Sequence, residues 1–80
     1  MKFAYFHLMP YTGKKDETTD WPVANKLFDP DLGKQLYDTY LDSMVQAEAA
    51  GFDWIGCNEH HMSPYGMMAN PNIVAASLIL

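Results

Sequence analysis

The spacing of apolar side chains changes twice along this chain of 80 residues, and the change limits the folds open to it. From 31 to 50 the apolar residues recur every three or four positions, as on the buried face of an amphipathic helix; they are Leu36, Tyr37, Tyr40, Leu41, Met44, Val45 and Ala47. Short apolar runs at 2–9 and 52–57 stand on either side and are typical of buried strands. A strand, a helix and a strand in this order predict a right-handed crossover between two parallel strands.

Proline, glycine and asparagine mark the ends of these elements. Pro10 ends the first strand, and Gly51 stands where a left-handed residue closes the helix. Asn70 and Pro71, a favoured cap and a favoured first helical residue, begin a second, largely apolar helix. The first strand is apolar on both faces, so we expect both faces to be covered, as in the parallel sheet of an α/β fold.

The connection from 11 to 30 is polar and contains Gly13, Pro22, Pro30 and the charged run 14–17. Connections of this length without structure of their own are uncommon in compact domains and often serve as lids or binding loops. We therefore expect a long loop near the functional site, with the charged run on its solvated surface.

Composition excludes several classes of partner. Ten acidic residues against five basic ones give a net charge of −5, and scattered basic residues do not neutralise the phosphates of a nucleic acid. The single cysteine excludes an internal disulfide. No apolar run approaches the roughly 20 residues that cross a bilayer, and no signal peptide is recognisable. We expect a cytoplasmic protein that binds neither nucleic acid nor membrane.

A carboxylate and two imidazoles, Glu59, His60 and His61, directly follow the second strand. The carboxyl ends of parallel strands are where α/β proteins bind ligands, and such groups can accept, donate and orient protons near neutral pH. Neighbouring residues of an extended segment point to opposite sides, so one histidine can face the opening while the other packs. His7, near the end of the first strand, is a further candidate, either for the pocket or as a packed core residue.

A metal site is a weaker interpretation. Cys57 and Asp53 add ligand types, but the H-E-x-x-H spacing and a second cysteine are missing, so we predict no metal ligand. Four methionines are candidates for an apolar pocket or for filling the core; they are Met9, Met62, Met67 and Met68.

The run A-A-G-F-D-W-I-G-C-N-E-H-H at 49–61 continues through Tyr65-Gly66 to Asn70-Pro71, and Lys2-Phe3 opens the chain. In these motifs the chain resembles the amino-terminal portion of the bacterial luciferase-like flavin-dependent monooxygenases. The resemblance covers the first strand and everything from about Tyr37 onward. The combination of motifs is much more specific than any one of them.

The resemblance implies that residues 1–80 are the truncated amino-terminal part of a (β/α)8 TIM barrel, its first two βα units, with a long loop at 11–30. It implies an oxidoreductase in which reduced FMN reacts with oxygen to give a flavin peroxide that oxidises a small organic substrate, with a flavin reductase as partner. His60 matches the catalytic histidine, and Glu59 and His61 match supporting positions. Met62 replaces an aromatic residue of the luciferase subunits and would reshape the substrate opening. The phosphate-binding segments lie later in the family, so no cofactor-binding residue is assigned.

Three alternatives stay open at this point. A related branch of the superfamily uses a deazaflavin and transfers hydride without oxygen. A metal-dependent barrel hydrolase and a non-catalytic small module belong to other classes. Two strands cannot close a barrel, and unpaired edges and apolar surfaces favour association. We therefore expect the isolated chain to be inactive, and to oligomerise or to be completed by further chain.

Overall fold

The protein is described here by a computed structural model covering residues 1–13, 24–61, 63–64 and 66–79. Strand β1 (Ala4–His7) and strand β2 (Trp54–Cys57) form a parallel pair in which Ala4 lies beside Trp54 and His7 beside Cys57. Helix α1 (Pro30–Ala49) connects them, a short 3-10 turn (Asn25–Leu27) precedes α1, and helix α2 (Pro71–Leu78) follows β2. The predicted mixed α/β content and parallel strands are confirmed.

Helix α1 ends where the sequence predicts, but it begins at Pro30, within the segment predicted as a long loop. The Asp29 side chain accepts hydrogen bonds from the backbone N–H groups of Asp31 and Leu32 at 2.9 and 3.3 Å, and Pro30 occupies the first turn. After Ala49 the chain reverses at Gly51, whose φ of 96° lies in the left-handed region that favours glycine. The predicted helix end at Gly51 is thereby confirmed.

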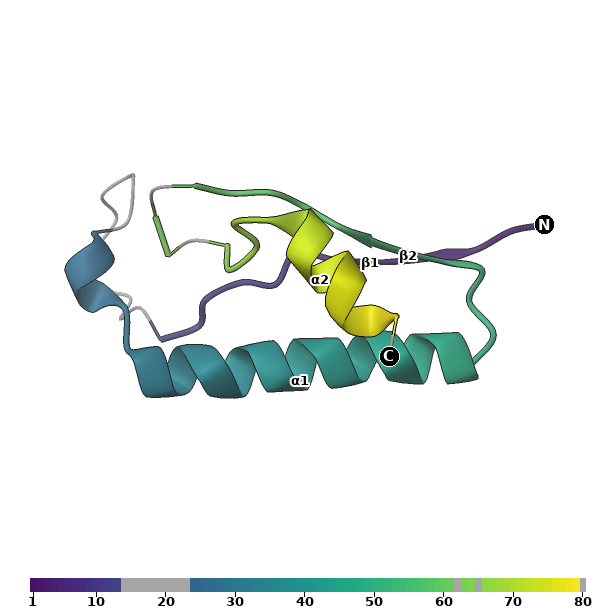
Figure 1. Cartoon of the computed structure of the whole chain (residues 1–80), viewed down its shortest axis with the longest axis horizontal. Helices are drawn as coiled ribbons and strands as arrows, with labels where there is room; N and C mark the ends of the chain where they lie inside the picture. The colour runs from purple at the N-terminus through teal and green to yellow at the C-terminus, as the bar shows by residue number, and fades with distance from the viewer. Residues whose placement is uncertain (14–23, 62, 65, 80) are drawn as a thin grey trace.

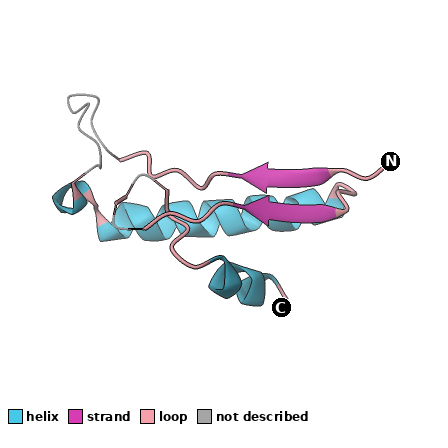
Figure 2. Ribbon diagram, turned by 90° about the horizontal axis from the view of Figure 1, so that it is seen from above, coloured by secondary structure: helices cyan, strands magenta, loops and turns pink. Residues whose placement is uncertain are grey.

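Both helices lie on the same side of the two-stranded sheet, as Figures 1 and 2 show together. Helix α1 runs along the sheet, and α2 packs beside it near β2. The core fills the space between the sheet and α1 and is rich in sulfur and tyrosine; its buried members are Met9, Tyr11, Tyr40, Met44, Met67, Met68 and Val74. The prediction that methionines fill the core is confirmed for Met9, Met67 and Met68.

Tyrosine hydroxyls connect the core to the loops. Tyr40 donates to the carbonyl of Pro10 at 2.6 Å, and Tyr37 donates to the carbonyl of Met67. Burial raises the pKa of both hydroxyls above the ordinary value for tyrosine. Both groups therefore stay protonated at neutral pH and can act as donors.

The prediction that both faces of the first strand are covered is wrong for the part of the chain described here. The face carrying Tyr5 and His7 packs toward α1, whereas Phe6 and Leu8 on the opposite face are 58% and 52% exposed. Trp54, at the start of β2, is 60% exposed. The reason is geometric: both helices occupy one side of the sheet, so nothing in the described ranges covers the other.

Candidate functional site

The segment after β2 folds back over the carboxyl ends of both strands. The His60 N–H donates to the carbonyl of Met68 at 2.8 Å, and the Met67 N–H donates to the carbonyl of Met9 at 2.8 Å. Pro10 and Gly66 form an isolated antiparallel bridge next to these bonds. The loop that carries the predicted catalytic residue is thus fixed to the end of β1 as well as to β2.

His60 lines a hollow of about 340 Å³ at this edge of the molecule. The described residues that line it come from the end of the 11–30 connection, from α1 and from the loop after β2; they are Asn25, Phe28, Tyr37, His60, Ser63, Pro64, Gly66, Met67 and Ala69. Gly66 is needed for this arrangement, because a Cβ atom there would lie 2.8 Å from Nδ1 of His60. The half-buried imidazole therefore sits against backbone and faces a space large enough for a small ligand.

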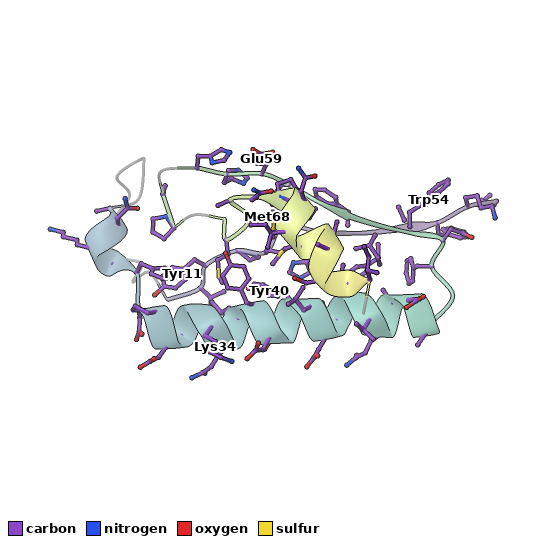
Figure 3. The ribbon with its side chains drawn as sticks, in the orientation of Figure 1. Tyr11, Lys34, Tyr40, Trp54, Glu59 and Met68 are labelled. Atoms are coloured by element: carbon purple, nitrogen blue, oxygen red, sulfur yellow. The ribbon has the colours of Figure 1, made fainter. Side chains whose placement is uncertain are left out.

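Glu59 and His61 form a pair on the surface. Nε2 of His61 lies 2.6 Å from Oε1 of Glu59, and both side chains are more than half exposed. Figure 3 shows Glu59 on the side of the loop turned away from α1. Residues 59 and 61 share one side of the extended segment and His60 lines the hollow, so the predicted alternation of the two histidines is found. An exposed pair of this kind contributes little to stability.

His7 lies in the layer between the sheet and α1. Its ring centroid is 4.6 Å from that of Tyr40, and its Nδ1 accepts a hydrogen bond of 2.8 Å from the Met9 N–H. That bond requires Nδ1 to be unprotonated, so a neutral His7 carries its proton on Nε2. His7 is not among the described residues that line the hollow, and its contacts are those of the packed core histidine, the second interpretation offered for it above.

Two predicted features lie outside the described residues. Met62, expected to shape the substrate opening, is one of them, and so is the charged run 14–17 of the long connection. Cys57 is half-buried and packs against the core. Within the described ranges, no group of three or more His, Cys, Asp or Glu side chains is arranged to hold a metal ion. Neither α1 nor α2 has both the length and the apolar character needed to cross a membrane.

Asn58 is a polar residue of this region that the sequence reasoning missed. Its side-chain Oδ1 and Nδ2 are buried, and neither has a hydrogen-bond partner among the described residues. Buried amides in native proteins are almost always hydrogen-bonded, so an exception calls for an explanation. Its place between the end of β2 and Glu59 was the available signal in the sequence.

Replacing Asn58 by leucine, which has a similar size, is expected to stabilise the fold by about 1 kcal/mol, because a buried amide without partners costs desolvation energy that an apolar side chain does not. Urea unfolding measures the change in the free energy of unfolding. Gln46→Leu is the control, since it removes an amide at an exposed position of α1. Glutamine and leucine have similar helix propensities, so the helix itself should be little affected. A loss of stability in Asn58→Leu that Gln46→Leu does not share would contradict the absence of a partner.

Comparison with known proteins yields no match: no family model fits the chain, and neither the curated proteins nor the solved structures include one that is significantly similar. The resemblance to luciferase-like monooxygenases therefore rests on the sequence motifs alone, which are residues 49–61, Tyr65-Gly66, Asn70-Pro71 and Lys2-Phe3.

Proposed function

We propose that this chain is the amino-terminal part of a luciferase-like flavin-dependent monooxygenase, in which reduced FMN, oxygen and a small organic substrate meet at the carboxyl edge of the sheet. The observation that carries the proposal is the position of His60, three residues after the end of the parallel strand β2 and beside a hollow of about 340 Å³. Active sites of (β/α)8 barrels lie at this end of the strands.

The barrel itself is part of the proposal. Two parallel strands joined by a helix on one face are the repeating unit of a (β/α)8 barrel, whose interior is filled by the side chains of the other face. In this chain the other face carries Phe6 and Trp54, which are large, apolar and more than half exposed. These side chains are of the kind that fills a barrel interior once further strands close around it.

The residues near the carboxyl edge suit one part of FMN. Leu8, which follows the end of β1 and is 52% exposed, offers an apolar surface for the flat flavin ring. Lys2 pairs with Asp53 and Lys34 pairs with Asp38. We therefore assign neither lysine to the phosphate of FMN. When bound, reduced FMN would supply the electrons that activate oxygen, and a flavin reductase would renew it.

His60 would serve as the proton-handling group of the site. Imidazoles hold or release a proton near neutral pH, and this one is held by its backbone bond to Met68 and by its seat on Gly66. A substrate bound in the hollow would lie beside the imidazole ring of His60. Glu59 and His61 contact each other at the surface, so any support that they give to the loop would be small.

The test is incorporation of oxygen from labelled O2 into an organic product by the protein in its full native length. Reduced FMN, regenerated by a flavin reductase and NADH, is supplied with a panel of aliphatic and aromatic aldehydes and ketones. Free reduced FMN consumes oxygen without an enzyme, so oxygen uptake alone does not suffice, and mass spectrometry must find oxygen-18 in the product. Hydride transfer to or from a deazaflavin, or hydrolysis after metal addition, with no labelled product would support the alternatives.

A further inference from the structure

Residues 24–29, here called the return limb, lead into α1 and contribute one wall of the hollow beside His60. Asn25 and Phe28 of the limb both line the hollow, opposite residues of the loop that follows β2. Because the limb and that loop are far apart in sequence, the width of the hollow depends on how firmly the limb is held.

Tyr11 holds the return limb. Its ring is 2% exposed, its hydroxyl accepts a hydrogen bond of 2.7 Å from the Asp29 N–H, and it donates one of 3.3 Å to the carbonyl of Leu27. The ring centroids of Tyr11 and Phe28 are 5.0 Å apart. Figure 3 shows Tyr11 between the chain that follows β1 and the start of α1. The limb is thereby fixed to the core on both sides of Phe28.

Gly33 determines where the Phe28 ring lies. A Cβ atom at Gly33 would be 2.4 Å from Cζ of Phe28, so the ring rests directly on the backbone of α1. The Phe28 ring therefore packs against the Tyr11 ring and against the backbone of α1 at Gly33, and it also borders the hollow.

The described lining of the hollow combines apolar and neutral polar groups. Phe28, Tyr37, Pro64 and Met67 are apolar or aromatic, whereas Asn25 and Ser63 add hydrogen-bonding groups near His60. No Asp, Glu, Lys or Arg occurs among these lining residues. Such a lining suits a neutral, amphipathic molecule of the size of a small ketone and disfavours an anion.

We infer that Phe28 is a specificity-determining residue: its ring, held by Tyr11 and Gly33, sets the size of the neutral molecule that reaches His60. The inference rests on the proposed function, because this molecule is taken to be the substrate. The experiment measures how accessible the His60 side chain is and requires no turnover. The inference and the proposed function can therefore fail separately.

The experiment measures the rate at which diethyl pyrocarbonate modifies each histidine of the native-length protein, located by mass spectrometry. Acetophenone is expected to slow modification of His60 in the wild-type protein, whereas the larger 2-acetonaphthone is not. Phe28→Ala should raise the rate at His60 several-fold and extend protection to 2-acetonaphthone. Phe28→Trp should lower the rate. His61, which is exposed and does not line the hollow, is the internal reference in every sample.

Leu27→Ala is the matched control, because Leu27 neighbours Phe28, is equally exposed and does not line the hollow. It should leave the rate at His60 unchanged. Equal rates in wild type, Phe28→Ala and Phe28→Trp would overturn the inference, as would an equal effect of Leu27→Ala. If Phe28→Ala does not fold, Phe28→Trp and Tyr11→Phe, which weakens the hold on the limb, decide the question. In the latter variant faster modification of His60 supports the inference and an unchanged rate opposes it.

Discussion

Replacing His60 by alanine is expected to lower the rate of product formation in the native-length protein by about 100- to 10,000-fold, the usual contribution of general acid or base catalysis. The imidazole lines the hollow and is the titratable group that the loop after β2 contributes to the lining described here. Because the backbone bond to Met68 does not involve the side chain, the loop should keep its conformation in the variant. The measurement is kcat for incorporation of labelled oxygen, followed as a function of pH.

The matched control for this prediction is His61→Ala. It removes an imidazole from the next residue, but one that is exposed and contacts Glu59. We expect its kcat to stay within a factor of a few of the wild-type value, since an exposed pair contributes little. Equal losses in the two variants would argue for a structural effect on the loop, and full activity of His60→Ala would remove His60 from the proposed mechanism. A second variant, His60→Gln, keeps hydrogen-bonding capacity without proton transfer and should remain slow.

Replacing Met9 by alanine is expected to lower the free energy of unfolding by about 2–5 kcal/mol, the range for removing a buried long side chain. Met9, two residues after the end of β1, is fully buried in the core cluster that includes Met44 and Met67. A loss of this size is a large fraction of the stability of a small domain. Urea or thermal unfolding, followed by far-ultraviolet circular dichroism, gives the difference from wild type.

Val45→Ala on α1 is the comparison for the core prediction, because Val45 is more than half exposed. Its change should stay within about 0.5 kcal/mol, as is usual for surface positions. If Met9→Ala were no more destabilising than Val45→Ala, the methionine cluster would not be the core of the folded protein. The backbone bond between Met67 and Met9 does not depend on the side chain, so the variant tests packing alone.

The elements of the fold were predictable because their signals are local. The spacing of apolar residues, the capping Asn70 side chain and the left-handed Gly51 act within one or two turns of chain. The start of α1 was not predicted, because Asp29 and Pro30 were assigned to the long loop. The exposure of Phe6 and Leu8 was not predictable in the same way. An apolar strand face has the same sequence whether or not the elements that would cover it are present, so periodicity cannot report which face is open.

The candidate site was predictable only around its centre. Alternation along an extended segment separates His60 from Glu59 and His61, and the structure has this arrangement. The walls of the hollow come instead from residues distant in sequence, among them Phe28 and Tyr37, and no local pattern brings these to His60. Two of the three aromatic residues in the polar connection 11–30, Tyr11 and Phe28, were the available signal, since such side chains are rarely left in solvent without a role.

The sulfur-rich core has a further consequence for a protein proposed to handle activated oxygen. Methionine is readily oxidised to its sulfoxide, which is polar and disrupts apolar packing. Met9, Met44, Met67 and Met68 are each at most 5% exposed, so the folded chain shields all four from a dissolved oxidant. If the loop after β2 opens and hydrogen peroxide enters, Met67 or Met68 would be oxidised to the sulfoxide. The core is thus a chemical record of how often the site region opens.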